Sequence, residues 1–320
     1  MKKKISALLL AVLLLLSLAA CGGAKAKTYS VGIIQIVQHP ALDAATQGFR
    51  DALTEKLGDK VTFDEQNANG DPATCAVIAN QFVSANVSLI MANATPSLQA
   101  AQAATNKIPV LGTSVTDYGT ALGIDNWTGT TGTNISGTSD LAPLDQQAAM
   151  LKELFPDAKN VGILYCSAEP NSKYQSTVIT GLLTEMGYTV KDYTFSDSND
   201  LQTVAGAAAD ESDVIFLPTD NTVASNIEII KNVCLPKEVP VIAGEEGICK
   251  GYGVATLSIS YYDLGYATGL MAYEVLEKGA EPATMAIQYA PKFTRKYNPV
   301  VTEALGITLP SDYEAIDMTA

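Results

Sequence analysis

Three polar residues follow a short apolar run in the segment "VIFLPTDNTVAS" (214–225). Residues 214–217 predict a buried strand, and a helix is predicted to begin at Asn221. Thr219, Asp220 and Asn221 lie between the two, although one helix needs only one capping side chain. Asp220 could form an Asx turn and Asn221 could cap the helix. The remaining hydrogen-bonding groups predict a polar site at this turn.

Polar side chains also follow five other predicted strands. In open α/β sheets, ligands bind beyond the carboxyl ends of the strands. We therefore expect these turns to face one shared cleft. In order along the chain, the six turns contribute Gln38 and His39; Asn93, Thr95 and Ser97; Thr113, Ser114, Asp117 and Tyr118; Ser167, Glu169, Asn171 and Ser172; Thr219, Asp220 and Asn221; Glu245 and Glu246.

The first three turns differ in charge from the last three. The first half of the chain offers mostly neutral donors at predicted helix N-termini, where a carboxylate is stabilised. The second half offers Asp220, Glu245 and Glu246, which suit an ammonium group. Together they predict a small zwitterionic ligand such as an amino acid. The alternatives are that Ser97 is a simple helix cap and that Glu245 and Glu246 are solvated loop charges.

The sequence repeats itself at a nearly constant offset. "VGIIQI" at 31–36 is echoed by "VGILYC" at 161–166, and "IPVLGTS" at 108–114 by "VPVIAGE" at 239–245. In both halves, apolar runs alternate with segments of helical period, which is typical of a parallel sheet covered on both faces. We predict an α/β protein made of two doubly wound parallel-sheet lobes.

The lobes are expected to be joined by a multi-strand hinge. We assign residues 28–138 and 290–320 to the first lobe and 139–289 to the second, including a long helix at 261–278. A chain that crosses more than once between lobes forms a hinge, so closure of the lobes is the expected motion.

Composition and net charge disfavour several kinds of partner and site. The chain has 320 residues and a formal net charge of −14, which disfavours nucleic acid and anionic lipid surfaces as partners. It has one histidine and no Cys-x-x-Cys pair, so no metal site is expected. Cys234 and Cys249 flank a predicted strand and could form a disulfide. We favour the reading that they, Cys75 and Cys166 are separate buried thiols.

The N-terminus has the pattern of an export signal. Lys2, Lys3 and Lys4 precede an apolar run too short to span a membrane, which predicts a signal peptide at 1–20. "SLAAC" resembles a bacterial lipobox, which predicts lipidation of Cys21 and a tether at 21–27. The expected location is the extracytoplasmic face of the cell membrane, held there by the lipid alone. The alternative is an ordinary secretory signal with an incidental cysteine.

Several motifs together resemble one known family. They are "YSVGIIQIVQHPALDAATQGFRDAL", "NANGD", "ATPSLQAAQAATNKIPVL", "NISGTSD", "PTDNTVAS" and "SISYYDLGYATGLMAYEVL". They resemble the ABC-transporter substrate-binding lipoproteins of the tryptophan/tyrosine-binding type, over essentially all of the chain after the signal. The resemblance implies a type I periplasmic-binding-protein fold and delivery of an amino acid, preferably aromatic, to an ABC permease. We expect a monomer with no cofactor and no enzymatic activity.

The resemblance also implies roles for single residues. Thr95 and Ser97 would bind the ligand carboxylate, and Asp220 and Glu245 the ammonium. The rest of the ligand-binding set is Thr138, Ser139 and Asp140 at the hinge-side wall, Ser167 and Asn171 from the second lobe, and Gln38, Thr113, Ser114, Thr219 and Asn221. The segment 118–133 departs from the family pattern.

Two other functions fit the same fold. A sensory module would present its closed form to a receptor, and a sugar- or nucleoside-binding member would use aromatic platforms such as Trp127. An enzyme is disfavoured because no Gly-x-Ser-x-Gly elbow is present and one histidine leaves few possible triads.

Overall fold

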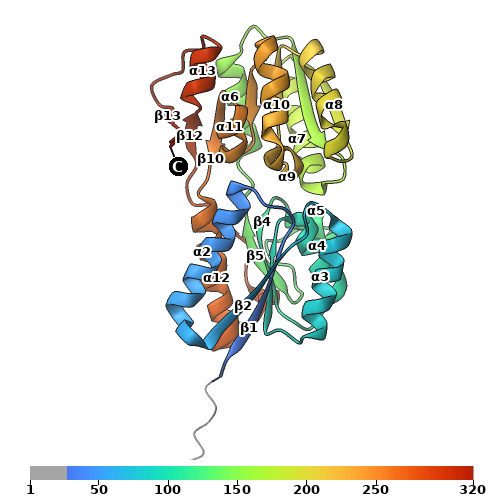
Figure 1. Ribbon diagram of the computed structural model, residues 1–320, viewed down its shortest axis with the longest axis vertical. Helices are drawn as coiled ribbons and strands as arrows, with labels where there is room; N and C mark the ends of the chain where they lie inside the picture. Colours follow the sequence, from blue (N-terminus) through green and yellow to red (C-terminus); the bar gives the residue numbers. More distant parts are fainter. Residues whose placement is uncertain (1–26, 320) are drawn as a thin grey trace, which may run out of the picture.

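The computed structural model describes residues 27–319, which form two lobes stacked along the long axis of the molecule (Figure 1). The first lobe holds a six-stranded parallel sheet with the order β2-β1-β3-β4-β5-β11. Its strands are β1 (Tyr29–Gln35), β2 (Val61–Asn67), β3 (Leu89–Asn93), β4 (Val110–Val115), β5 (Ile135–Ser139) and β11 (Gln288–Tyr289). One face is covered by α2 (Pro40–Leu57) and α12 (Tyr261–Lys278), and the other by α3 (Pro72–Ser84), α4 (Thr95–Ala104) and α5 (Tyr118–Leu122).

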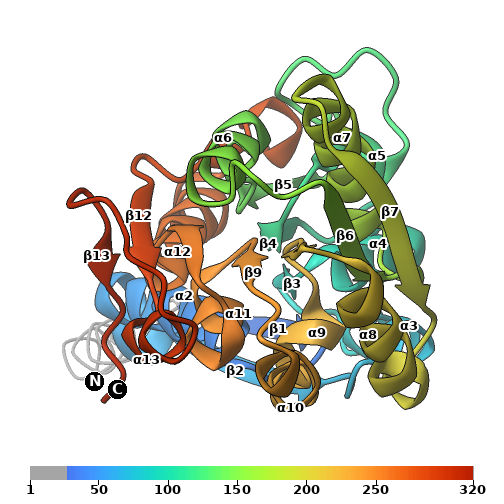
Figure 2. The ribbon, with the colours of Figure 1, turned by 90° about the horizontal axis from the view of Figure 1, so that it is seen from above.

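The second lobe repeats this order with one more strand, β7-β6-β8-β9-β10-β12-β13. Neighbouring strands of this sheet are parallel except for the pair β10 and β12, which is antiparallel. Its strands are β6 (Asn160–Cys166), β7 (Thr189–Phe195), β8 (Val214–Leu217), β9 (Val241–Ala243), β10 (Ala255–Ser258), β12 (Thr294–Tyr297) and β13 (Glu314–Ala315). Its helices are α6 (Leu144–Leu154), α7 (Pro170–Glu185), α8 (Ser198–Glu211), α9 (Asn221–Ser225), α10 (Ile227–Cys234), α11 (Glu246–Tyr252) and α13 (Pro299–Ala304). Figure 2 shows α6 and α7 on one side of this sheet and α8, α10 and α11 on the other. The predicted pair of doubly wound lobes is confirmed.

The predicted lobe boundaries are wrong at the C-terminal end. Helix α12 packs along α2, and β11 pairs with β5, so residues 261–289 lie in the first lobe and not in the second. Strand β12 pairs with β10, so the segment from β12 onward lies in the second lobe and not in the first. The chain therefore passes between the sheets after β5, after β10 and after β11.

Small residues explain why α12 belongs to the first lobe. Gly265 faces the backbone of Ala45, and Gly48 faces the backbone of Tyr262, so α2 and α12 touch at their main chains. Any larger side chain at either glycine would push the helices apart. Sequence periodicity predicted the bounds of α12 correctly but not its partner, since glycine spacing along one helix does not say which helix it meets.

Local side-chain contacts set the start of α3 and the state of the cysteines. Helix α3 begins after Asp71, whose carboxylate accepts a 2.9 Å hydrogen bond from the Ala73 amide, and the helix buries Cys75, Ile78, Ala79 and Phe82. The four cysteines of residues 27–319 are buried free thiols, which agrees with the favoured reading. The predicted signal peptide and Cys21 lie outside the described residues. Among the helices of 27–319, none is both long and apolar enough to cross a membrane.

Candidate functional site

The carboxyl ends of the strands of both lobes meet at one seam. Helices α4 and α5 of the first lobe contact α7 of the second, and α2 contacts α11 (Figure 1). Thr95 and Asp117 lie beside Asn171 and Tyr174 around one small gap at this seam. Polar turns that are more than fifty residues apart in the sequence are therefore brought together, as the sequence predicted.

A hydrogen bond crosses the seam at His39. Its Nε2 lies 3.2 Å from Oδ1 of Asn221, and both residues are buried. Asn221 is fixed from behind by Glu169, whose Oε2 accepts from the Asn221 backbone amide at 3.0 Å and from Asn221 Nδ2 at 2.7 Å. Oε1 of Glu169 accepts from the amide and hydroxyl of Thr222, each at 2.8 Å. Glu169 thus holds the start of α9 and sets the orientation of the Asn221 amide.

Several buried polar atoms at the seam have no partner. Oγ1 of Thr95, Oγ of Ser114 and Nδ1 of His39 come from the first lobe, and Oδ1 of Asn171 comes from the second. Ser114 also has a φ of 55°, a left-handed conformation that is uncommon for serine. Each unsatisfied buried group costs about 1–3 kcal/mol. A polar ligand at the seam would offset this cost.

The carboxylate oxygens of Asp220 and Glu245 accept hydrogen bonds from backbone amides. Asp220 Oδ2 accepts from the Cys166 amide at 2.7 Å, and Oδ1 accepts from the Val223 amide at 2.8 Å. Glu245 accepts from the amides of Gly247 at 2.6 Å and Ile248 at 2.5 Å. Burial raises the pKa of Glu245 to about 7, and burial together with the nearby Glu169 raises the pKa of Asp220. Asp220 therefore both caps α9 and ties it to the end of β6.

Other predicted ligand residues bond within their own lobe. The Ser97 hydroxyl lies 3.6 Å from Cys75 Sγ. Thr113, Thr138 and Thr268 form a chain of hydroxyls 3.2 and 2.8 Å apart, directed at α12. These contacts lie within the first lobe, and the sequence could not show the direction in which each hydroxyl would point.

Three predicted residues lie at the margin of the seam. Gln38 is exposed, and Ser167 is exposed and donates to the Phe195 carbonyl at 3.0 Å. Thr219 is partly buried, and its hydroxyl lies 3.4 Å from the Gly244 carbonyl. Their roles in binding stay predictions.

Of the hinge residues Ser139 and Asp140, only Asp140 contacts a second crossing. Ser139 Oγ donates to the Thr116 carbonyl at 2.8 Å. Asp140 accepts from Tyr261 Oη at 3.0 Å and from Thr116 Oγ1 at 3.1 Å. Burial raises the pKa of Asp140 to about 6, although both hydrogen bonds oppose that rise.

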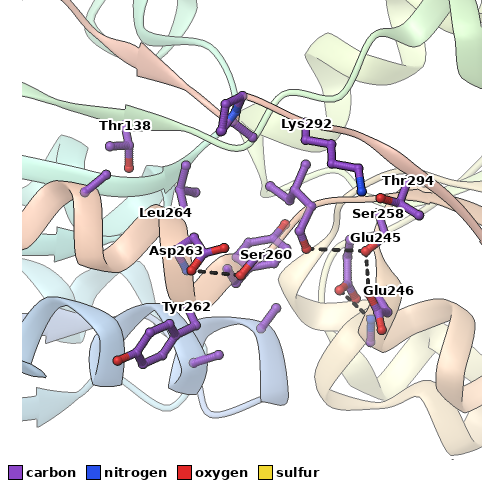
Figure 3. Close-up of a pocket in the computed structure, with 18 of the residues that line it drawn as sticks. Thr138, Glu245, Glu246, Ser258, Ser260, Tyr262, Asp263, Leu264, Lys292 and Thr294 are labelled. Carbon is purple, nitrogen blue, oxygen red and sulfur yellow. Dashed lines mark hydrogen bonds between the residues drawn. The ribbon is translucent and has the colours of Figure 1, made fainter. Parts of the chain in front are cut away.

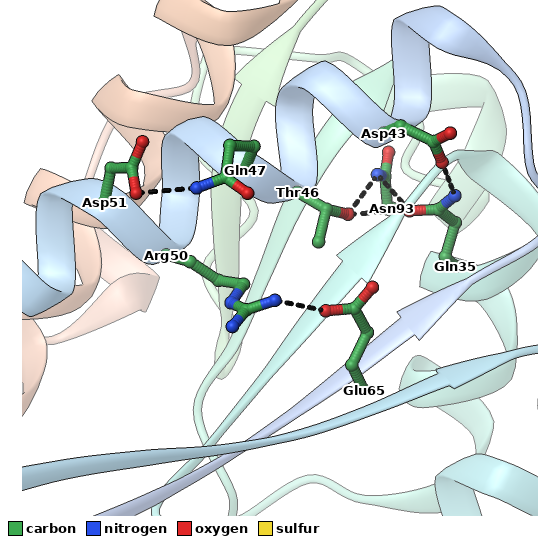
Figure 4. Close-up of polar contacts among 8 residues, drawn as sticks. All are labelled: Gln35, Asp43, Thr46, Gln47, Arg50, Asp51, Glu65 and Asn93. Carbon is green, nitrogen blue, oxygen red and sulfur yellow. Dashed lines mark hydrogen bonds and ion pairs between the residues drawn. The ribbon is translucent and has the colours of Figure 1, made fainter.

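A polar network fixes the start of α2 (Figure 4), the helix that His39 precedes. Gln35 donates to Asp43 at 2.7 Å and accepts from Thr46 at 2.7 Å. Asn93 donates to Thr46 at 3.0 Å and to the Leu42 carbonyl at 2.8 Å. Gln35 of β1 and Asn93 of β3 thus hold the helix against the sheet, while Pro40 occupies its first position.

A groove runs beside the hinge, between α2, α11 and the last two crossings (Figure 3). Its volume is about 810 Å³, and its walls include Thr138 and Glu245 of the predicted set together with Tyr261, Tyr262 and Tyr289. It contains none of the unpartnered atoms at the seam. Trp127, considered above as a stacking platform, instead packs against Tyr118 with ring centres 6.4 Å apart, so it anchors its loop.

Among residues 27–319, no group of three or more histidine, cysteine, aspartate or glutamate side chains is arranged to hold a metal ion. The unpartnered polar atoms at the seam are two hydroxyls, one amide oxygen and one imidazole nitrogen. Their chemistry suits the reversible binding of a polar organic molecule.

Comparison with known proteins agrees with this geometry. The model of the family described as "ABC transporter substrate binding protein" matches residues 30–316. The chain belongs to this family. It is thus a substrate-binding protein and not an enzyme. A curated relative, the "Tyrosine-binding protein" of Clostridioides difficile (strain R20291), is 39% identical over 254 residues, which is 78% of this chain and 73% of the relative.

Two solved structures of similar sequence differ in how well they superpose. An ABC domain from Streptococcus pneumonia in complex with L-Trp is 31% identical and covers 89% of this chain and 96% of its own, with a TM-score of 0.84. A ligand-free, open substrate-binding protein with adhesive properties from Clostridium difficile is 35% identical and covers 90% and 99%, with a TM-score of 0.68. The substrate-binding protein described here is thus closer in shape to the tryptophan complex than to the open form.

Proposed function

We propose that this substrate-binding protein takes up one aromatic amino acid between its lobes and delivers it to an ABC permease for import. The observation that carries the proposal is the set of buried, unpartnered polar atoms contributed by both lobes at the seam. A closed seam without a ligand leaves these atoms unsatisfied. A zwitterion supplies both donors and acceptors, so binding favours closure by its contacts with the two lobes together.

The relatives support the choice of ligand class. One is named for binding tyrosine, and the other was solved with L-Trp. For the carboxylate we favour Thr95, because it is the first residue of α4, where amides and dipole attract negative charge, and its hydroxyl is unpartnered. Of the other contacts predicted from the sequence, we favour those of Ser114 and Asn171, because each has a buried oxygen without a partner.

The protein is proposed to act as a monomer on the extracytoplasmic face, anchored through a lipid on Cys21. The support is the lipobox-like "SLAAC" after the apolar run at the N-terminus. Cys21→Ser should move the protein from the membrane fraction to the soluble fraction of fractionated cells. Continued membrane attachment of this variant would refute the lipid anchor.

The binding proposal is tested by calorimetry on residues 22–320, which contain every described helix and strand. The protein is unfolded and refolded to remove carried ligand, then titrated with L-tyrosine, L-tryptophan and L-phenylalanine, and with a sugar and a nucleoside as controls. Saturable binding of at least one aromatic amino acid, at one site per chain, is expected. Binding of only the sugar or the nucleoside would overturn the ligand class while keeping the fold.

A further inference from the structure

His39 presents its two ring nitrogens to different surroundings. It is the residue before α2, 7% exposed, at the point where the first lobe meets α9 of the second. Its Nε2 lies against Asn221 Oδ1, and its Nδ1 is buried without a partner. The two nitrogens therefore need to be assigned separately.

The neighbours of the ring decide which nitrogen carries the proton. Asn221 Nδ2 donates to Glu169 Oε2 at 2.7 Å, so the oxygen of that amide must be the atom that faces His39. An amide oxygen only accepts, so Nε2 of His39 is the donor. Burial lowers the pKa of His39, which keeps the ring neutral. Nδ1 is then a bare acceptor.

A buried acceptor needs a donor, and the local charge selects which kind. The charged groups acting on the ring are the carboxylates of Glu169 and Asp43. This negative surrounding favours a cationic donor over a neutral one. The oxygens of Asp220 and Glu245 already accept backbone amides, whereas Nδ1 has no competing partner.

We propose that His39 recognises the ligand's ammonium group through Nδ1 and, through the same ring, couples that recognition to closure by donating from Nε2–H to Asn221. The proposal rests on the proposed amino-acid function. It assigns the ammonium contact to a neutral imidazole, whereas the family resemblance implied the carboxylates of Asp220 and Glu245. A ligand without an ammonium group leaves Nδ1 unsatisfied. Such a ligand therefore binds the closed state less tightly than an amino acid does.

Two substitutions separate the roles of the two nitrogens. His39→Gln places a donor near the Nε2 position and removes the Nδ1 acceptor, whereas His39→Asn keeps an acceptor near Nδ1 and cannot reach Asn221. L-tyrosine and its analogue 3-(4-hydroxyphenyl)propanoate, which lacks the amine, are titrated into each protein. The wild-type preference for tyrosine should shrink about 10- to 100-fold in His39→Gln, as expected for one hydrogen bond to a charged group. In His39→Asn both ligands should weaken by a similar factor.

His39 is the single histidine of the chain, so its ring can be observed without any substitution. In protein labelled with 15N-histidine and purified without a histidine tag, the spectrum of the closed, L-tyrosine-saturated protein should show the Nε2–H tautomer. Saturation with L-tyrosine should move the Nδ1 resonance in the direction of hydrogen-bond acceptance. The Nδ1–H tautomer, an unmoved Nδ1 resonance, or an unchanged preference in His39→Gln would each overturn this inference while tyrosine binding itself persists. Wild-type protein that binds no amino acid would overturn the proposed function, and the inference with it.

Discussion

Tyr261 donates a 3.0 Å hydrogen bond to Asp140 and so joins two crossings of the hinge. Asp140 follows β5, at the start of the first crossing, and Tyr261 opens α12, at the end of the second. Both side chains are buried, and Thr116 donates to the other carboxylate oxygen. The relative position of the crossings is therefore fixed by one carboxyl group that accepts from two hydroxyls.

Removal of the Tyr261 hydroxyl should weaken the folded protein. Tyr261→Phe leaves one oxygen of a buried carboxyl without its donor, which costs about 1–3 kcal/mol of unfolding free energy. Tyr262→Phe is the matched control, because its hydroxyl donates to Asp51 at 3.0 Å on the exposed surface of the same helix. Urea unfolding of both variants at pH 7 measures the difference. Equal stability of the two variants would refute a structural role for the Asp140 contact.

Asp140 should also give the protein a distinct pH dependence. Its folded pKa is about 6, above the ordinary 3.8, so the folded state keeps a proton that the unfolded state has lost between these values. The stabilisation from this group is complete below about pH 4 and is lost as pH rises through 6. Relative to Asp140→Asn, wild type should lose up to about 3 kcal/mol of unfolding free energy over that range.

Urea unfolding of wild type and Asp140→Asn at pH 4.5 and pH 7.0 measures this change. Glu245, whose pKa is also raised, is present in both proteins, and since burial is the largest cause of that rise and Asp140 the last of its causes, most of its contribution cancels in the comparison. A difference between the two proteins that stays constant with pH would contradict the assignment.

Sequence reasoning located the cleft but not the direction of each side chain. Strand repetition and turn composition were enough to predict two lobes whose polar turns meet, because both depend on local patterns. The partner of each hydroxyl depends on packing between distant segments, as Ser97 shows by facing Cys75 of α3. His39 and Glu169 were assigned to the turns that face the cleft, but both were omitted from the ligand set. A polar residue directly before a proline-started helix was the signal at both positions.

Thr95 and Ser97 make a matched pair on α4. The Thr95 hydroxyl is buried and unpartnered, whereas the Ser97 hydroxyl faces the lobe interior. Thr95→Val should weaken binding of the preferred aromatic amino acid about 10- to 100-fold, since it removes a hydrogen bond to a charged carboxylate. Ser97→Ala should leave the affinity within about two-fold of wild type. Calorimetric titration measures both, and the reverse order of effects would show that Ser97 is the residue contacting the carboxylate.

The central claim is that the two lobes close on the ligand, and small-angle X-ray scattering tests it most directly. Ligand-stripped residues 22–320 are measured alone and with a saturating aromatic amino acid whose binding has been established by calorimetry. The account predicts a smaller radius of gyration with ligand and a scattering curve that matches the closed structure described here. An unchanged radius of gyration with ligand bound would contradict binding by closure of the lobes.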